Sequence, residues 1–260
     1  MFVPLHRDYE PPTQKTMSVY RVYLEIDDQG WCMAHVPEPL GCFTLEKSKK
    51  QALNKLPQKI SEHILWLKRN GEKITKPKKI EMKICEIQMG TCPRISGNEA
   101  AIFSFDLIPP SEKKIKQVLR WMGYNRKELL TKTKRLSDEV LDWKPDKKTR
   151  SIRETLSHVA NCDWWYLSRF KDWKKLYTVP QDYPPERIFE KLDTMRKLAI
   201  QILKNLSLKD RYRINIPKKY ARHKDEVWTA GKMLRRFLEH EREHIETIDR
   251  ALLRYNEARR

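Results

Sequence analysis

The chain has 260 residues, of which 39% are hydrophobic and 10% aromatic, including eight Trp. A disordered chain lacks the apolar surface that offsets conformational entropy, so this composition predicts a folded protein of one or two domains. No run of about 18 apolar residues is present, which argues against a membrane-spanning helix. The first residues also lack the apolar stretch of a secretion signal, and we therefore expect a cytoplasmic protein with no membrane partner.

The net charge of +19 comes from 54 Lys and Arg against 35 Asp and Glu, and it is unevenly distributed. Residues 1–110 hold 16 basic and 13 acidic side chains, whereas residues 111–260 hold 38 and 22. The balance of basic and acidic side chains changes at Pro109 and Pro110. We predict a domain boundary there, with one domain over residues 1–108 and another over residues 109–260.

The first domain combines strand and helix patterns. Residues 20–26 alternate apolar and polar side chains, residues 27–30 are typical of a hairpin turn, and residues 31–36 supply a returning strand. Residues 48–68 repeat apolar side chains at helical spacing, and residues 80–89 alternate again as a strand. The order predicts a small α+β domain of the form βββαβ.

Several of these residues carry a family resemblance. A turn with Asp28, Gly30 and Trp31 is followed by Pro39, Leu40, Gly41 and Cys42, which carry most of a Pro-x-x-Gly-Cys element, and by a helix rich in Ala, Leu and Asn. This order, over about residues 18–90, resembles the HicB-like family. HicB antitoxins usually carry a DNA-binding segment after this domain and none is evident here, so the resemblance implies a fold more than a toxin-neutralising role.

The second domain has a helical pattern throughout. Apolar side chains recur at helical spacing over residues 111–136, 151–170, 185–206 and 229–255. Ser151 and Glu154 have the spacing of a capping box at the start of the second of these helices. The pattern predicts an all-α four-helix bundle, with most of its basic residues on the outside.

Three histidines interrupt the apolar faces of these helices. His240 and His244 are four residues apart and share a face with Phe237 and Ile248, while His158 lies on the inward face of the second helix. One buried histidine is more often structural, but three that converge indicate a divalent metal. Imidazole suits zinc, nickel, copper and iron alike, so the residues do not select the metal. A purely structural role is the alternative.

The same residues literally fit the H-E-x-x-H motif of zinc proteases, in which Glu241 would be the general base. The motif is short, and only 16 residues remain after His244 to supply a third ligand. Its metzincin extension also fails, because Thr247 and Arg250 stand where Gly and His are required. A protease is therefore disfavoured, and we expect Glu241 to be a solvated helix residue.

A second resemblance covers about residues 112–256. An L-x-W-x-P loop at residues 141–145 precedes an S-I-x-E run that ends at His158, and Trp228-Thr229 precedes the H-x-x-x-H of the last helix. This order and spacing resemble the DinB/YfiT-like family. The resemblance implies a four-helix bundle in which His158, His240 and His244 hold a divalent metal, zinc or nickel. In many relatives the last histidine continues into a His-Arg-Gly-Gln run, whereas here His244 is followed by Ile245, Glu246 and Thr247, which leaves the substrate contacts undefined.

The resemblance further implies a metal-dependent enzyme, a thiol-dependent transferase or hydrolase. Relatives use low-molecular-weight thiols such as bacillithiol or mycothiol, and a small-molecule substrate is expected here. Cys162 stands one helical turn after His158 and is either a core residue or a metal or redox partner. Trp164 and Trp165 are expected to pack in the core, although they could line a pocket.

Two other functions remain open. A nucleic-acid partner is suggested by basic clusters, although no recognition motif accompanies them; the clusters contain Lys113, Lys114, Lys116, Lys132, Lys134, Arg135, Lys144, Lys147, Lys148, Arg150, Lys218, Lys219, Arg222 and Lys224. A non-catalytic scaffold, in which a closed four-ligand metal site only staples the bundle, is the second. Bundles of this kind often pair, so a homodimer is a further expectation.

Overall fold

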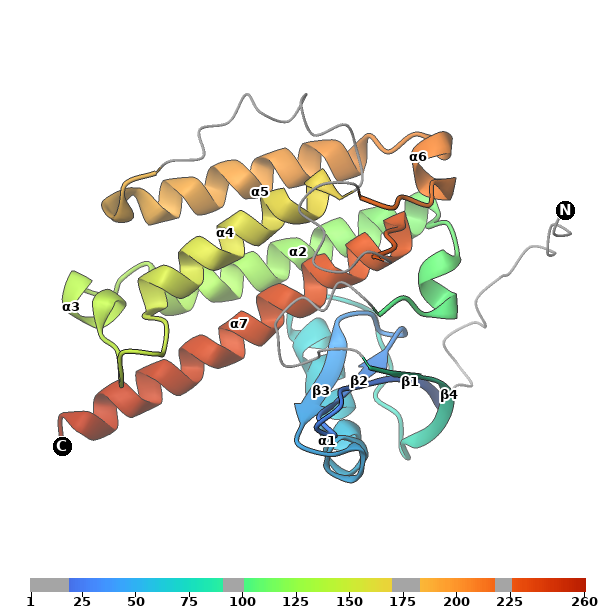
Figure 1. The fold of residues 1–260 in the computed structure, drawn as a ribbon, viewed down its shortest axis with the longest axis horizontal. Helices are drawn as coiled ribbons and strands as arrows, with labels where there is room; N and C mark the ends of the chain where they lie inside the picture. The colour runs from blue at the N-terminus through green and yellow to red at the C-terminus, as the bar shows by residue number, and fades with distance from the viewer. Residues whose placement is uncertain (1–18, 91–100, 170–182, 218–225) are drawn as a thin grey trace, which may run out of the picture.

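The structure is a computed structural model, and it describes residues 19–90, 101–169, 183–217 and 226–260 (Figure 1). Cys92 and the basic cluster at residues 218–224 lie outside the described residues, as does position 170, the predicted end of a helix. Within the described ranges, none of the helices combines the length and the apolar character needed to cross a lipid bilayer.

The N-terminal part is a four-stranded sheet with one helix. The strands are β1 (Val19–Ile26), β2 (Cys32–Val36), β3 (Cys42–Glu46) and β4 (Glu81–Met89), and the helix α1 (Lys49–Arg69) lies between β3 and β4 in the chain. The strand order is β3-β2-β1-β4; β4 runs parallel to β1, and the other neighbours are antiparallel. Apolar side chains of α1, among them Leu56 and Ile60, pack on Val22 and Leu24 of β1. The predicted βββαβ order is present.

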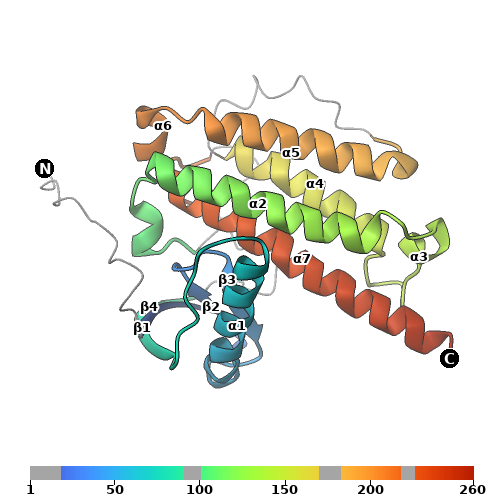
Figure 2. The same cartoon turned by 180° about the vertical axis from the view of Figure 1, so that it is seen from behind.

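The C-terminal part is mostly helical. Its α-helices are α2 (Glu112–Thr133), α3 (Asp138–Asp142), α4 (Ile152–Ser168), α5 (Ile188–Lys204), α6 (Leu208–Tyr212) and α7 (Ala230–Ala258). The long helices form a bundle in which α4 packs against α5 and α7, and α2 packs against α7 and α5 (Figures 1 and 2). The four predicted helices are all present. The short helices α3 and α6 were not predicted, because five residues are too few to establish a helical period.

The two parts share a hydrophobic core. Leu40 and Trp66 of the N-terminal part belong to the same buried cluster as Trp121 of α2 and Phe237 of α7. Helix α7 lies between the sheet and the other helices of the bundle (Figures 1 and 2). One face of α7 therefore meets the sheet, and another meets α4.

Most basic residues that the structure describes in the C-terminal part are not buried, in line with the prediction, but some are. The buried ones are Arg126, Arg153, Arg169, Lys191, Arg196, Lys232, Arg235 and Arg236. Burial of a cation is tolerated when carboxylates compensate it. Several of these residues surround the histidines that the sequence singles out.

Candidate metal centre

Helices α4 and α7 run antiparallel and provide all three predicted histidines (Figure 1). The start of α4 is fixed by the predicted capping box: the Ser151 hydroxyl accepts a hydrogen bond from the Glu154 N–H, and the Glu154 carboxylate accepts one from the Ser151 N–H. This cap lies two turns before His158 on the same helix, so it sets where the α4 imidazole meets α7.

The three imidazoles come together. The Nε2 atom of His240 lies 3.2 Å from Nε2 of His158 and 3.0 Å from Nε2 of His244. His240 and His244 are buried, and His158 is half-buried. The Cys162 Sγ atom is 3.6 Å from Nε2 of His158, and the nearest ligand atoms of His158, Cys162 and His240 all lie within 4.8 Å of one another.

The buried imidazoles are uncharged at neutral pH. Burial lowers the pKa of His240 well below its usual value, and the neighbouring His244 and His158 lower it further. Burial and His158 likewise lower the pKa of His244 to about 3. Neutral imidazole is the form that offers a lone pair to a metal ion.

This arrangement fits a divalent metal better than a set of hydrogen bonds. A proton on Nε2 of His240 can be donated to only one of the two Nε2 atoms that face it. Two imidazole nitrogens bound to one tetrahedral zinc lie about 3.3–3.4 Å apart, given the usual Zn–N length. The two separations measured from His240 are within a few tenths of an ångström of that distance. A single ion between the rings would satisfy all three lone pairs.

Four buried charges lie on the side of this cluster that faces α2 and α5. Arg126 Nε donates to Glu241 Oε1 at 2.7 Å, and Arg126 Nη2 donates to Asp163 Oδ2 at 3.1 Å. Arg196 pairs with Asp163 through both Nε and Nη2, at 3.0 and 3.1 Å, and its Nη2 lies 2.9 Å from Glu241 Oε2. Each residue comes from a different helix of the bundle. Because Glu241 follows His240 and Asp163 follows Cys162 in the chain, the quartet holds both ligand-bearing helices in register.

The prediction that Glu241 is solvated is therefore wrong. Its side chain is 1% exposed and is held by two guanidinium groups. A carboxylate held in this way is not placed to act as the general base of an H-E-x-x-H protease. The H-E-x-x-H motif could not predict the burial of Glu241, because a Glu beside a His in a helix is equally common on exposed faces.

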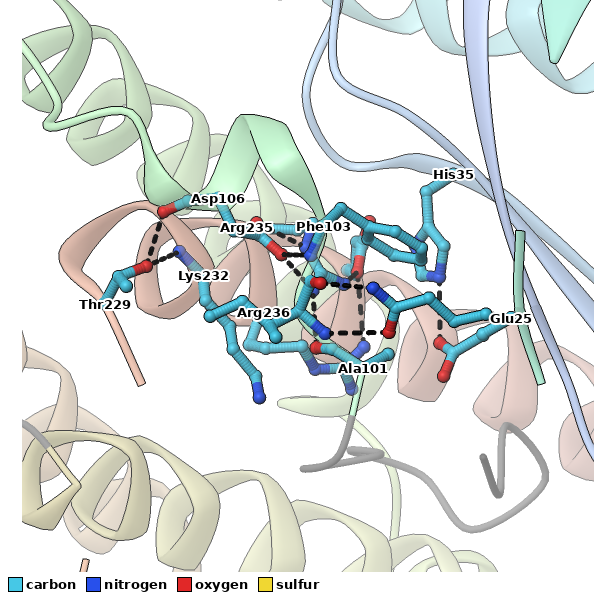
Figure 3. A network of polar contacts seen from close by, with 12 residues as sticks. Glu25, His35, Ala101, Phe103, Asp106, Thr229, Lys232, Arg235 and Arg236 are labelled. Atoms are coloured by element: carbon cyan, nitrogen blue, oxygen red, sulfur yellow. Dashed lines mark hydrogen bonds and ion pairs between the residues drawn. The ribbon is translucent and has the colours of Figure 1, made fainter. Parts of the chain in front are cut away.

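A second buried network joins α7 to the sheet (Figure 3). His35 of β2 bonds to Glu25 through Nε2 and to Glu239 of α7 through Nδ1, each at 2.8 Å. Arg235 pairs with Asp106 through Nε and Nη2, at 2.9 and 2.8 Å, and its Nη1 donates to Glu239. The sequence reasoning did not single out any of these residues. Glu239 precedes His240, so this network fixes α7 from the sheet side as the quartet does from the bundle side.

Trp164, Trp165 and Cys162 of α4 also lie near the histidines. Trp165 stacks edge-on against Trp228, with ring centroids 5.5 Å apart, and Trp164 packs against the cluster around Leu156 and Val159. Both contribute to packing, as expected. Cys162 is half-buried and lies beside the imidazoles.

The fold and the histidine cluster define a helical-bundle protein with a candidate metal centre and a small sheet packed on it. The sequence model of the DinB superfamily matches residues 122–248. UPF0150 protein Ta0767 of Thermoplasma acidophilum is 35% identical over 65 residues, which are 25% of this chain and 94% of that protein. The C-terminal region is therefore DinB-like, and over those 65 residues the chain belongs to the UPF0150 family.

A solved structure is also similar. It is described as YfiT from Bacillus subtilis, a probable metal-dependent hydrolase with an unusual four-helix bundle topology. It is 15% identical, covers 56% of this chain and 90% of its own, and has a TM-score of 0.43. The HicB-like assignment of residues 18–90 stays a prediction, as does the boundary between residues 108 and 109.

Proposed function

We propose that His158, His240 and His244 hold a divalent metal, zinc or nickel, and that the protein is a metal-dependent enzyme acting on a small-molecule substrate. The observation that carries the proposal is the convergence of three Nε2 atoms, with separations of 3.2 and 3.0 Å, from two helices. The uncharged state of the buried imidazoles supports it. The match of the C-terminal region to the DinB superfamily agrees with it.

A metal held by three nitrogens supplies Lewis acidity and lowers the pKa of a bound water or thiol. Such a nucleophile would attack an electrophilic substrate: a bound water would hydrolyse it, and a bound thiol would replace its leaving group. A low-molecular-weight thiol is one candidate substrate. The chain's own contribution is to fix the ligands: the Arg126, Asp163, Arg196 and Glu241 quartet on one side of α7 and the His35–Glu239 bond on the other restrain His240.

Cys162 decides whether this centre is open or closed. A zinc-bound thiolate and a zinc-bound imidazole nitrogen lie about 3.5 Å apart in tetrahedral geometry, and Sγ of Cys162 is 3.6 Å from Nε2 of His158. We propose that the three histidines suffice for metal binding and that Cys162 stands beside the reactive position. A metal lost on Cys162→Ala would instead indicate a four-ligand staple of the bundle.

Elemental analysis of full-length protein, purified without a histidine tag, tests the proposal. We expect about one divalent metal per chain, loss of most of it in His158→Ala, and retention in Cys162→Ala. His63→Gln is the matched control, because His63 is a buried histidine that bonds to the Leu40 carbonyl at 3.2 Å, away from the cluster. Substoichiometric metal that does not change in His158→Ala would refute the proposal.

A further inference from the structure

Arg236 lies one helical turn before His240 on α7 and is 1% exposed. On the facing helix, Tyr166 follows Cys162 by one turn, and its ring lies edge-on to His240 with centroids 5.6 Å apart. Because α4 and α7 run antiparallel, the sequence of facing positions is His158 with His244, Cys162 with His240, and Tyr166 with Arg236. Arg236 thus occupies the level of the helix pair next to the candidate metal centre.

The guanidinium of Arg236 is only partly used. Its Nη1 donates to Glu239 Oε2 at 3.2 Å. Its Nε and Nη2 atoms are buried and have no hydrogen-bond partner among the residues that the structure describes. Buried hydrogen-bond donors without a partner are uncommon in folded proteins, so these two donors indicate a position where a ligand binds. The bond to Glu239, three residues further along α7, draws Nη1 toward the C-terminal end of that helix.

The two unused donors form a recognition edge. Nε–H and Nη2–H of an arginine point in the same direction and bind the two oxygens of one oxyanion together. Other buried arginines of this molecule use that same edge for a carboxylate, and two of them are close to the candidate centre or to Arg236. Arg196 binds Asp163 in this way at 3.0 and 3.1 Å, and Arg235, the neighbour of Arg236, binds Asp106 at 2.9 and 2.8 Å. Among these three guanidiniums, Arg236 differs in having no internal carboxylate on that edge.

The charge of the proposed centre favours the same kind of ligand. Three neutral imidazoles around a divalent cation leave two positive charges uncompensated, and Arg236 adds a third within one helical turn. The nearby Glu239 is shared with His35 and Arg235. Glu243 and Glu25 also act on Arg236 through their charge, but neither bonds to its Nε or Nη2. A small ligand that carries an oxyanion would complete both the hydrogen bonding and the charge.

We propose that Arg236 is a substrate-binding residue, whose Nε and Nη2 hold a carboxylate or phosphate group of a small organic anion while another part of that anion reaches the three-histidine centre. The inference rests on the proposed metal-dependent function and narrows its substrate to anionic molecules. Arg236 would select and orient the substrate without taking part in bond making. A neutral substrate of the same shape would bind less tightly, because it would leave the buried donors unpaired.

Calorimetric titration of the full-length protein with succinate and with inorganic phosphate tests this inference, in both metal-loaded and metal-free forms. We expect wild type to bind at least one of the two anions, and the tighter one indicates which oxyanion the edge prefers. Arg236→Gln should weaken that affinity about tenfold or more, since hydrogen bonds to charged groups are lost. Arg236→Lys keeps the charge without the two-pronged edge and should give an intermediate loss. Arg254→Gln, an exposed arginine of the same helix, should leave binding unchanged.

The outcomes separate this inference from the proposed function. Failure of wild type to bind metal would contradict the function, while the metal-free titrations would still compare wild type with Arg236→Gln. Anion binding that depends on the metal but is equal in all Arg236 variants would overturn the inference and leave the function standing. Absence of binding of either anion to wild type would also overturn it. If neither variant folds, the Arg236 Nε–H resonance of ¹⁵N-labelled wild type decides: we expect it to shift with added anion, and a fixed resonance contradicts the inference.

Discussion

At the scale of single residues, buried ion pairs hold the two ligand-bearing helices: Arg126 and Arg196 bind Asp163 of α4 and Glu241 of α7. The histidines beside them could be predicted from the sequence, whereas the buried arginines could not. A histidine on an apolar helix face stands out, because its neighbours predict burial and an imidazole in a core needs a partner. Arginine and glutamate at helical spacing are equally typical of exposed faces that carry ion pairs. Arg196, Asp163 and Glu241 gave no signal for this reason, although their contacts position the ligand-bearing helices.

The buried quartet predicts a large loss of stability when one charge is removed. Glu241→Ala leaves Arg126 and Arg196 without one of their two carboxylates in the core. We expect the free energy of unfolding in urea to fall by about 3–5 kcal/mol. Glu257→Ala, at the exposed end of the same helix, should change it by less than about 0.5 kcal/mol. A small effect at Glu241 would mean that the quartet does not hold the bundle together.

The bond between His35 and its two carboxylates predicts a pH dependence of stability. Burial alone would lower the pKa of His35, but the charge of Glu239 and the bonds to Glu239 and Glu25 outweigh it and raise the pKa. The contribution of His35 to the free energy of unfolding is therefore fully present below its ordinary pKa of 6.5. It is lost as pH rises through the raised pKa of the folded state. Burial alone would raise the pKa of Glu239, but His35 and Arg235 lower it to about 2. The contribution of Glu239 to stability is fully present above its ordinary pKa of 4.5 and is lost as pH falls through the lowered pKa of about 2.

Comparison of wild type with His35→Gln measures the pH-dependent contribution of His35 to stability. The difference in free energy of unfolding should be largest below about pH 6.5 and should shrink as pH rises through the raised pKa of His35. Chemical denaturation over a neutral-to-alkaline pH series is the measurement. A difference that stays constant, or grows with pH, would show that His35 is not charged between Glu25 and Glu239.

At the scale of elements, the helices and strands followed from their hydrophobic periods. The capping box placed the start of α4 correctly, and the predicted helix ends differ from the observed ones by a few residues. The short helices α3 and α6 could not be predicted, because each begins with a capping serine, Ser137 or Ser207, but extends for little more than one turn.

The N-cap of α4 predicts the effect of its removal. Ser151→Ala deletes the hydroxyl that accepts from the Glu154 N–H and should lower stability by about 1 kcal/mol. Ser151→Asn keeps an acceptor at this position and should restore most of the loss. Thermal unfolding followed by circular dichroism compares the variants. Equal stability of Ser151→Ala and wild type would mean that the cap does not determine where α4 begins.

At the scale of the whole molecule, the docking of the sheet on α7 could not be predicted from the sequence. The pattern of each part predicts its own core, whereas the joint between them depends on buried contacts far apart in the chain, such as the one from His35 to Glu239. The composition change at Pro109 and Pro110 predicted two domains, and the structure adds a shared core and buried ion pairs between the two parts.

The closeness of this joint predicts the effect of one added methyl group. A Cβ at Gly41 would lie 3.1 Å from the Leu238 Cβ of α7, and the φ of Gly41 is +88°. Gly71 has a φ of +90°, but a Cβ there would meet nothing within 4 Å. Both alanine variants should lose about 1 kcal/mol from the unfavourable φ, and Gly41→Ala should lose about 1–3 kcal/mol more from overpacking. Equal losses in urea unfolding would contradict the close packing of the sheet on α7.

The measurement that most directly tests the central claim is anomalous X-ray diffraction at the absorption edge of the metal found in untagged protein. A single strong peak within bonding distance of the Nε2 atoms of His158, His240 and His244 is the predicted result. Absence of a peak between the three rings, in crystals of protein supplied with zinc and nickel, would contradict the account.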